Sequence, residues 1–533
     1  MVKTNVFRMM AVFVCMLLCL VTEAGCRRQT EDEYYWHSYW EENEVPIEAS
    51  DSSSNDTSSA GLLSSEVGSE NDSSNDENST VTVVINPNDK PSLKNTAGLL
   101  NPMSTKSDAQ AEKLRNSILN TNDNLKISGT KYYISNYGDD DNDGKSPETA
   151  WKTISKIAKV SLKEGDAVLF ERGGVYRGTI KAASGVTYAA YGTGDKPAIY
   201  QSYQNAAEIE WASAGENIWV APGSYEDAGI VIFNHGELVG ARKTSKKALK
   251  ENGDYFCAGN ILFLYMNRQP ATAFNSIEIG TDSHIITISG GVHDVVIDNL
   301  TLKYTGAHGI SALNGVENIT VTNCEIGWIG GSYLNGFGDG KVRYGNGIEF
   351  WEGCKNVLVE NCWVYQIYDS GLSHQGKGTF VVENLAFKCN LIEYVSMCSI
   401  EYWAPSKNIN SLKNIEYSSN IMRFAGYGWG EIERPSHGAV HIGTTENDNL
   451  CENFIIKNNI FDTATNQLLS IKHLAGTLPI LQGNTYIGKF GSKIGVCAAG
   501  SSMDNATYFI GEDSEEVLHN IYKDVGAKVL INE

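Results

Sequence analysis

The chain has 533 residues and a formal net charge of −22, from 42 lysines and arginines against 64 aspartates and glutamates. Nucleic acid is therefore excluded as a partner, because an acidic chain without a basic tract lacks the cations that would neutralise phosphates. The composition changes along the chain, so its regions are considered in order.

Residues 1–25 have the features of a bacterial secretion signal. Basic residues precede an apolar run from Met9 to Val21, which is too short to span a membrane. The tripeptide AGC that ends at Cys26 resembles a lipoprotein cleavage site, although Glu23 stands where an apolar residue is usual. We expect export and lipidation of Cys26, which would hold the protein on the surface of a bacterial envelope. Simple secretion into the extracellular medium is the alternative.

Residues 26–125 are rich in Ser, Asn, Asp and Glu and poor in apolar residues. Such a segment cannot bury enough apolar surface to order itself, which predicts a disordered linker. It has no Lys or Arg from Glu31 to Asn78, so it supplies much of the net charge. Acidic linkers repel themselves and extend, and this one would hold the folded domain at residues 126–533 away from the envelope.

The region at about 205–275 differs from the rest of that domain. Its segments IVIFNHGELVGARK and DYFCAGNILFLYMN contain short apolar runs and are separated by Lys-rich polar turns. This pattern is typical of paired antiparallel strands and predicts a β-rich insertion. It contains no constellation of residues that suggests catalysis.

One nine-residue pattern recurs six times between residues 293 and 462, with starts 24, 38, 28, 30 and 39 residues apart. Apolar residues alternate within each copy and so lie on one side of a strand. Stacked coils of such strands share one core, which predicts an all-β solenoid, a parallel β-helix. The copies are DVVIDNLTL from Asp294, NITVTNCEI from Asn318, NVLVENCWV from Asn356, NLAFKCNLI from Asn384, NIEYSSNIM from Asn414 and NFIIKNNIF from Asn453.

Asparagines stand near the end of most copies, where a turn needs a side chain that bonds its own backbone and tolerates a left-handed conformation. We expect them to stack as a ladder. Cysteines at equivalent places are expected to be mostly buried free thiols, with disulfide pairing in an exported protein as the alternative, and no Cys or His spacing suggests zinc. The ladder positions are Asn299, Asn323, Asn361, Asn420 and Asn459, and the cysteines are Cys324, Cys362 and Cys389.

These repeats resemble those of right-handed parallel β-helix proteins of the pectate-lyase-like superfamily. The segment YYISNYGDDDNDGKSPETAWKTISKI from Tyr132 resembles the N-terminal cap of many such bacterial helices, and LKEGDAVLFERGGVYRGTI from Leu162 continues it. The resemblance covers about residues 130–500 and implies a right-handed helix with a cap and a carbohydrate-active function. The superfamily contains polysaccharide lyases, glycoside hydrolases and epimerases, so the fold alone does not fix the reaction.

The sequence DDDND at residues 139–143 lies in this cap. We interpret it as a turn whose carboxylates cap backbone groups. A structural Ca²⁺ held by Asp139, Asp141 and Asp143 is the alternative, because carboxylate oxygens are the ligands that Ca²⁺ prefers.

A second short strand follows each copy: GISAL, GIEFW, GLSHQ, SIEYW, AVHIG and LLSIK. Alternation predicts two columns of side chains that point away from the bore. Carboxylates, amides and aromatic rings in such columns are typical of a sugar-binding surface. The first column is Ser311, Glu349, Ser373, Glu401, His441 and Ser470, and the second is Leu313, Trp351, Gln375, Trp403, Gly443 and Lys472.

Two long loops precede this surface, GSYLNGFGDGKVRYG before Asn346 and GYGWGEIERPSHG before Ala439. We expect them to form the walls of a trough that binds a polysaccharide or oligosaccharide, with tryptophans stacking on sugar rings and polar groups bonding hydroxyls or a carboxylate. A solvent face with ordinary exposed polar residues is the alternative. The expected binding residues are Trp351, Ser373, His374, Gln375, Trp403, Glu431, Arg434, His437, His441 and Lys472.

Glycosidic hydrolysis usually needs two carboxyls, and three are candidates here: Glu349, Asp369 and Glu401. Two coils separate Glu349 from Glu401, which is about 9.5 Å, and Asp369 lies on a turn between them. Burial beside Trp403 would raise the pKa of Glu401 and suit it to donate the proton, with Asp369 as base or nucleophile and no catalytic metal.

Another carboxyl, Glu393, aligns with Arg423 and Asp462 in neighbouring coils, which predicts a structural ion pair.

Two other functions remain open. A Ca²⁺-assisted polysaccharide lyase would need a cation to neutralise a uronate and a base, for which His441 or Lys472 would serve. A non-catalytic glycan-binding surface protein is the third. For each of these functions we expect a monomer.

Overall fold

The computed structural model describes residues 104–533 except 124, 336–341, 405–410, 433–437, 448–449, 475–476 and 501–506. The predicted signal segment, Cys26 and most of the predicted linker lie outside the described residues. Within the described part, no helix is both long and apolar enough to cross a membrane.

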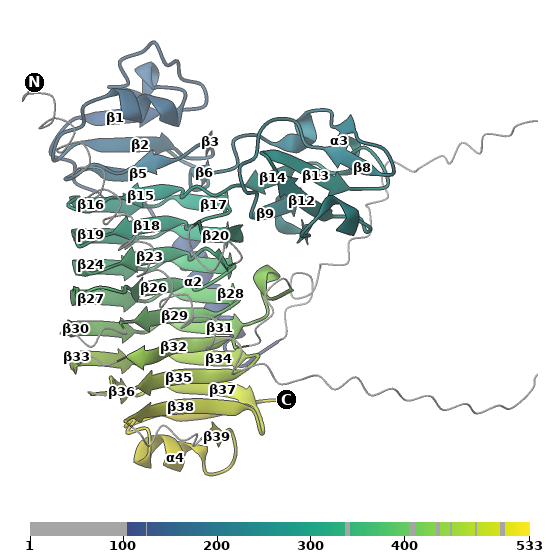
Figure 1. Ribbon diagram of the computed structural model, residues 1–533. Coiled ribbons are helices and arrows are strands. Elements are labelled where there is room, and N and C mark those ends of the chain that lie inside the picture. The colour runs from purple at the N-terminus through teal and green to yellow at the C-terminus, as the bar shows by residue number, and fades with distance from the viewer. Residues whose placement is uncertain are drawn as a thin grey trace, which may run out of the picture. The chain divides into compact units, whose positions relative to one another are not determined.

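Three ten-stranded sheets form the walls of a coil whose turns stack from β1 at one end to β38 at the other (Figure 1). Every neighbouring pair within them is parallel except the last pair of the third sheet, β38 and β39. The first sheet contains β1 (Lys131–Ile134), β2 (Ala167–Glu171), β5 (Thr187–Tyr191), β16 (His293–Asp298), β19 (Val316–Thr322), β24 (Cys354–Glu360), β27 (Val381–Lys388), β30 (Ser411–Ser418), β33 (Leu450–Lys457) and β36 (Ile480–Gln482).

The second sheet contains β3 (Val175–Arg177), β6 (Ala198–Tyr200), β17 (Thr301–Thr305), β20 (Glu325–Ile329), β25 (Trp363–Ile367), β28 (Leu391–Val395), β31 (Ile421–Ala425), β34 (Ile460–Ala464), β37 (Thr485–Lys489) and β40 (Lys528–Asn532). The third contains β4 (Ile180–Lys181), β15 (Ile286–Ile288), β18 (Ile310–Leu313), β23 (Ile348–Trp351), β26 (Leu372–Gln375), β29 (Cys398–Trp403), β32 (Val440–Asn447), β35 (Gln467–His473), β38 (Lys493–Ala499) and β39 (Tyr508–Phe509). The predicted all-β, right-handed parallel β-helix is confirmed.

Apolar side chains of equivalent strands stack in the bore. In the first sheet, Val295 pairs in register with Ile319, which pairs with Val357 and then Leu385. All four are buried and belong to one core cluster that runs through the coils. The alternation read from the sequence is therefore the alternation between bore and outer face, as the period of a strand requires.

Asparagines form two ladders along the stack rather than one. The residue that opens each repeat copy has a φ between 54° and 57°, the left-handed region that Asn tolerates. In this outer ladder each amide donates to the side chain of the preceding coil, as Asn356 Nδ2 does to Asn318 Oδ1 at 2.8 Å. This outer ladder is an addition to the one expected at the strand ends.

The second ladder lies at the strand ends, where an asparagine ladder was predicted. Asn420 and Asn459 are fully buried there, and Asn420 Nδ2 donates to Asn459 Oδ1 at 3.0 Å. Asn323 and Asn361 stand one position earlier in their copies and adopt the left-handed conformation instead, and Cys324 and Cys362 take the buried position beside them. The eight cysteines of the described residues are free thiols.

Residues between β6 and β15 form two small sheets outside the coil. One has the order β11 (Ala241–Arg242), β12 (Asp254–Ala258), β13 (Ile261–Tyr265), β8 (Ile218–Val220) and β7 (Ala212–Ser213), and the other β10 (Leu238–Val239), β9 (Ile230–Phe233) and β14 (Ile277–Gly280). They enclose a core of their own, to which the short helix α3 (Pro270–Ala273) adds residues. Ile230 and Ile232 pack against Tyr304 and Trp328 of the coil.

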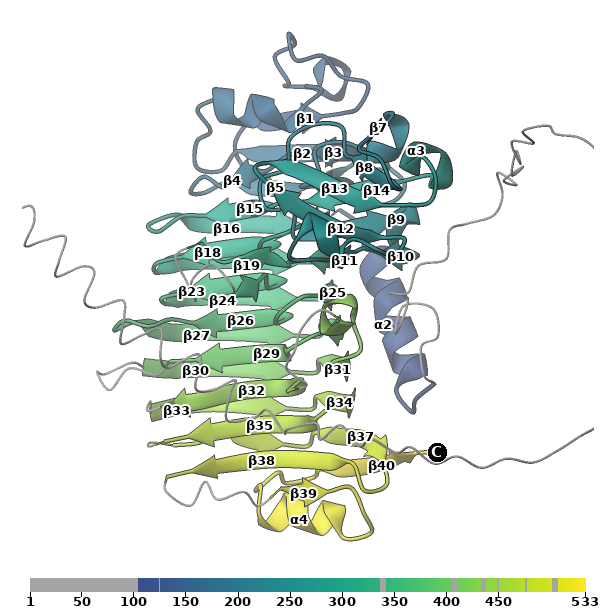
Figure 2. The same ribbon diagram turned by 45° about the vertical axis from the view of Figure 1, so that its right-hand side comes forward.

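The N-terminal segment is ordered further back than the predicted linker boundary at residue 125. Helix α2 (Asp108–Leu119) lies along the second sheet (Figure 2) and packs Ala111 and Ile118 on Leu391 and Ile421. We call residues 104–123 the strap. The linker prediction is wrong for the strap, because contacts with residues far away in the sequence compensate for its small number of apolar side chains.

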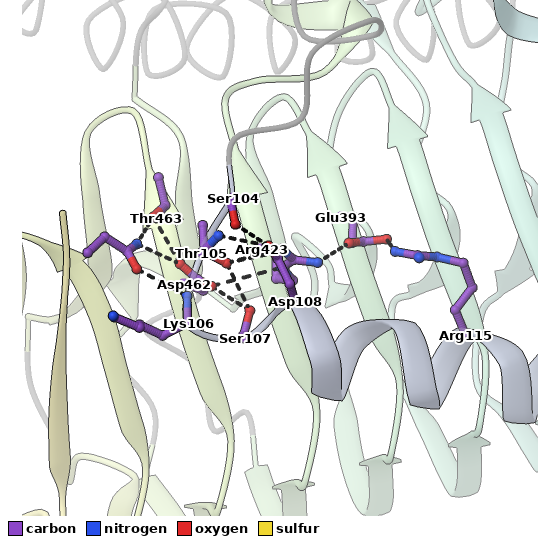
Figure 3. A network of polar contacts seen from close by, with 11 residues as sticks. Ser104, Thr105, Lys106, Ser107, Asp108, Arg115, Glu393, Arg423, Asp462 and Thr463 are labelled. Atoms are coloured by element: carbon purple, nitrogen blue, oxygen red, sulfur yellow. Dashed lines mark hydrogen bonds and ion pairs between the residues drawn. The ribbon is translucent and has the colours of Figure 1, made fainter.

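A buried ion network joins the strap to the coil (Figure 3). The guanidinium of Arg423 lies 3.0 Å from Glu393 and 3.9 Å from Asp462, and also contacts Asp108 of the strap. Arg115 of α2 lies 2.7 Å from Glu393. The structural ion pair predicted for Glu393 is confirmed, and the strap supplies two further members.

In the N-terminal cap, Asp139, Asp141 and Asp143 do not surround a common point. Asp139 Oδ1 accepts the N–H of Asp141 at 3.0 Å, and Asp143 Oδ1 accepts the N–H of Lys145 at 3.0 Å. Among the described residues, no group of three or more His, Cys, Asp and Glu side chains is placed to hold a metal ion. This geometry favours the capping interpretation over the Ca²⁺ alternative for this turn.

At the other end of the coil stands α4 (Ser514–Asn520).

Candidate active site on the third sheet

The predicted first polar column is present on the third sheet. Ser311 pairs in register with Glu349, Glu349 with Ser373, and Ser373 with Glu401. All four side chains point away from the bore, yet none is more than 6% exposed. These carboxyls therefore lie in a desolvated environment rather than on an open solvent face.

Glu349 is the most strongly perturbed carboxyl of this column. Its Oε2 accepts hydrogen bonds from Asn346 Nδ2, Ser373 Oγ and Gln375 Nε2, the last at 3.0 Å. Its Oε1 is buried and has no partner among the described residues. Burial raises the pKa of Glu349 to about 7, helped by the negative charge of Asp369, although the three donors lower it.

The other two candidate carboxyls are joined to Glu349 through the turn at residues 368–371. Asp369 is half-buried on this turn, and its backbone N–H donates to the carbonyl of Gly345 at 3.2 Å. Ser370 donates its Oγ–H to Glu401 Oε2 at 2.8 Å and its N–H to Asn346 Oδ1 at 2.8 Å. The structure thus brings together the three carboxyls that the sequence singled out.

The second column is partly as predicted. Trp351 pairs with Gln375, and Gln375 with Trp403, so two tryptophans flank the amide that bonds Glu349. Trp351 is half-buried and Trp403 is 8% exposed.

His374 does not belong to this surface. Its ring lies in the bore, stacked on Tyr402 with centroids 5.8 Å apart, and its Nε2 lies 2.5 Å from the hydroxyl of Tyr417. Burial lowers its pKa to about 3. The prediction that His374 is one of the binding residues of the trough is wrong, because alternation turns residue 374 inward once residue 373 points outward.

The comparison of the repeated strands also predicted the wrong position for His441. Ile442, not Val440, pairs with Ile400, so Gly443 follows Glu401 in the column. The imidazole of His441 is fully buried, stacks on Phe461 and has its Nδ1 3.0 Å from Ser399 Oγ. The loop before β32 shifts the register by two residues, which a single sequence does not reveal.

The remaining predicted binding residues divide into three groups. Lys472 is half-buried on β35, whose Ser470 pairs with Gly443, so it lies two coils beyond Glu401. Glu431 is half-buried on the short helix η7 (Trp429–Ile432). Arg434 and His437 lie outside the described residues.

Both predicted loops approach the turn that carries Asp369. The Trp429 indole N–H donates to the carbonyl of Gln366 at 2.9 Å, and its ring lies 5.5 Å from that of Tyr368. From the other loop, β22 (Arg343–Tyr344) pairs with β21 (Ser332–Tyr333), and the Arg343 guanidinium lies 4.6 Å from the centre of the Tyr368 ring.

Sequence reasoning missed a third polar column, which stands two residues before the inward Ile or Leu that opens each strand of the third sheet. Its members are His284, His308, Asn346 and Ser370. Each backbone N–H donates to the side chain of the coil before: His308 to His284 Nδ1 at 3.1 Å, Asn346 to His308 Nδ1 at 2.8 Å, and Ser370 to Asn346 Oδ1. The recurring triplets HII, HGI, NGI and SGL were the signal in the sequence.

An acidic group lies beside this third column. Asp282 Oδ1 accepts the hydroxyl proton of Tyr344 at 2.5 Å, and burial raises the pKa of Asp282. The Tyr344 ring meets His308 edge-on, with centroids 5.0 Å apart.

Some known proteins have a distant structural likeness to this chain. No family model matches the chain. A crystal structure of a lacto-N-biosidase from Eubacterium ramulus has 12% identity and a TM-score of 0.32, covering 79% of this chain and 70% of that one. A rhamnogalacturonan lyase structure has 11% identity and a TM-score of 0.38, covering 76% of this chain and 86% of that one. The likeness is one of fold, and the stacked parallel sheets of this chain are those of a parallel β-helix.

One curated relative matches this β-helix protein over a short stretch. A lacto-N-biosidase from Bifidobacterium longum subsp. longum is 39% identical over 85 residues. The matched stretch is 14% of this chain, and the chain spans only 5% of that relative's length.

Proposed function

We propose that this β-helix protein is a glycoside hydrolase in which Glu349 donates a proton to the glycosidic oxygen and Asp369 acts as base or nucleophile. The observation that carries the proposal is the buried Glu349 carboxyl, with a pKa of about 7 and an Oε1 that no described residue bonds. A carboxyl that keeps its proton near neutral pH beside a second carboxyl that ionises is how glycosidases divide the acid and base roles.

The neighbouring groups fit this division of roles. The charge of Asp369 raises the pKa of Glu349, which is the expected interaction of two close carboxyls. Glu401, which the sequence favoured as the acid, bonds Ser370 on the Asp369 turn and would position that turn. The flanking tryptophans offer apolar faces on which sugar rings stack. The short match to a lacto-N-biosidase is consistent with glycosidase chemistry.

A lyase receives less support. Of the two bases considered for it, His441 lies in the bore and Lys472 lies two coils beyond Glu401.

The test uses the protein from residue 104 onwards and a panel of plant, algal and host glycans. New reducing ends without the absorbance of unsaturated uronates support hydrolysis, whereas that absorbance indicates elimination. Binding without either product indicates a glycan-binding protein and contradicts the proposal. On a responsive substrate, Glu349→Gln and Asp369→Asn should each lower the rate by about 10² to 10⁴. Glu360→Gln on β24, in the same coil but on the first sheet, is the matched control.

We also propose that the protein is exported and held on a bacterial envelope by lipidated Cys26, with the residues before the strap as tether. Cys26→Ser should release the protein into the medium and abolish labelling by a radioactive fatty acid. Labelling that survives this substitution would contradict the anchor.

A further inference from the structure

His284 and His308 form a pair of parallel rings in consecutive coils, beside the proposed catalytic group. Their centroids are 5.0 Å apart and their planes differ by 17°. Each Nδ1 accepts a backbone N–H, from His308 and Asn346 respectively. A nitrogen that accepts a hydrogen bond carries no proton, so in both rings the proton is on Nε2.

Both Nε2–H groups are available as donors. Neither of them bonds any residue that the structure describes, and both side chains are half-buried rather than enclosed. Burial lowers the pKa of His284 to about 4 and that of His308 well below its usual value, so both rings are neutral at pH 7. They therefore present hydrogen-bond donors without a positive charge.

Two buried orphan atoms continue this strip towards the carboxyl pair. Ser311 Oγ is fully buried on β18 and has no partner among the described residues, and Glu349 Oε1, paired in register on the next strand, has none either. A buried polar atom without a partner costs free energy, which a bound hydroxyl would recover. Asn346 connects the two parts, because its N–H bonds His308 and its side chain bonds Glu349.

The charge around the strip is negative. Asp369 lies beside Glu349, and Asp282 accepts the hydroxyl of Tyr344, whose ring contacts His308. Arg343 donates to the carbonyls of Gly331 and Gly229, and Arg242 pairs with Asp227. Among the described residues, the side chains of the strip itself carry no positive charge, so a uronate carboxylate bound there would lie near the charge of Asp369 without a cation of the strip as its partner.

We propose that His284, His308 and Ser311 form a subsite that binds the hydroxyl or amide oxygens of an uncharged sugar next to Glu349. The substrate is therefore a neutral glycan and not a polyuronate. Three coil steps separate His284 from Ser370, a span of about 14 Å, so the strip extends past the ring at the cleaved bond. This inference rests on the proposed hydrolase function for its position relative to the cleaved bond.

The chain itself suggests the variants. In the next coil, Asn346 Oδ1 accepts the same kind of backbone bond that each histidine Nδ1 accepts. His284→Asn and His308→Asn therefore keep the structural acceptor and remove the Nε2–H donor. Ser311→Ala removes a hydroxyl that makes no bond to the described residues, so it should not lower the melting temperature. His293→Asn, on the first sheet, is the control.

Kinetics and calorimetric binding would use p-nitrophenyl lacto-N-bioside, xylan and galactan oligosaccharides as neutral probes and oligogalacturonate as the charged one. Each of the three variants should raise KM or Kd for the responsive neutral probe about three- to tenfold, with kcat nearly unchanged and the control like wild type. Oligogalacturonate should not bind.

Unchanged KM and Kd in Ser311→Ala and in both histidine variants would overturn the subsite, as would preferred binding of oligogalacturonate. The two proposals fail separately. If Glu349→Gln stays active while the subsite variants weaken binding, the catalytic assignment is wrong and the subsite stands. If Glu349→Gln is inactive and the subsite variants bind normally, the reverse holds.

Discussion

The Nδ1 of His308 accepts the backbone N–H of Asn346 at 2.8 Å, one coil further along the helix. The same Asn346 bonds Glu349 with its side-chain amide and Ser370 with its side-chain oxygen. A residue of the third column thus fixes both the proposed proton donor and the turn that carries Asp369. Asn346→Ala should therefore lower kcat/KM, although Asn346 is not itself the proposed acid or base. The substitution removes the bond that holds the Glu349 carboxyl and the bond that holds the turn of Asp369.

The pH dependence of activity should follow the protonation of Glu349. With a pKa of about 7, the donor is protonated below neutral pH, so kcat/KM should be level there and fall about tenfold per pH unit above it. Ser373→Ala removes a bond that lowers this pKa and should move the alkaline limb to higher pH. Asp369→Asn removes the neighbouring charge and should move the limb of any residual activity to lower pH. An alkaline limb that stays in place in both variants would contradict the assignment of Glu349.

Acid should destabilise the fold through histidines of the bore. Burial lowers the pKa of His374 and His441 to about 3 and that of His473 to about 4, from about 6.5 in the unfolded chain. The unfolded chain then binds more protons than the folded one, so this contribution is present above pH 6.5 and is lost as the pH falls towards 4. The melting temperature should fall over this window.

Glu349 acts in the opposite direction. Its raised pKa contributes stability below about pH 4.5 that is lost as the pH rises through 7. His374→Phe should flatten the acid side of the stability profile, and Glu349→Gln the neutral side. Melting curves between pH 4 and pH 8 measure both, and slopes that do not change in the two variants would contradict this account.

The features of the fold and site that could be predicted from the sequence are those whose pattern lies within a few neighbouring residues. The coil repeat and the inward alternation are visible within nine residues, so the fold and the column of Ser311, Glu349, Ser373 and Glu401 were predicted correctly. The register of β32 depends on the length of the loop before it, and there the prediction for His441 failed by two residues. His284 and His308 were missed because their column lies just before the strands that were aligned.

The strap could not be recognised from composition. Its helix buries only two apolar residues fully, Ala111 and Ile118, which is too few to predict order in a linker-like sequence. The partners that hold it, Glu393 and Arg423, lie about 280 to 320 residues away along the chain. Contacts over such a separation cannot be seen in the composition or periodicity of a short segment.

The two asparagine ladders should differ in their importance for stability. Asn420 is fully buried, and its side chain bonds Asn459 and the carbonyl of Phe387, so Asn420→Ala leaves buried groups unpaired and should cost about 1–3 kcal/mol. Asn356 is exposed in the outer ladder with a φ of 54°, so Asn356→Gly should cost less than Asn356→Ala. Denaturant unfolding of the three variants gives this order. An Asn420→Ala protein as stable as Asn356→Gly would contradict it.

Arg423 should be the most sensitive position of the strap network. It is 5% exposed and is the cation shared by Glu393, Asp462 and Asp108 (Figure 3). Arg423→Ala leaves buried carboxylates without their partner and should lower the free energy of unfolding by about 3–5 kcal/mol. Asp108→Asn removes a more exposed partner and should cost much less, while exposing the strap to limited proteolysis. In wild type the protease-resistant core should begin near residue 104. A core that begins near residue 125 in wild type, or an Arg423→Ala protein as stable as Asp108→Asn, would show that the strap does not contribute to the fold.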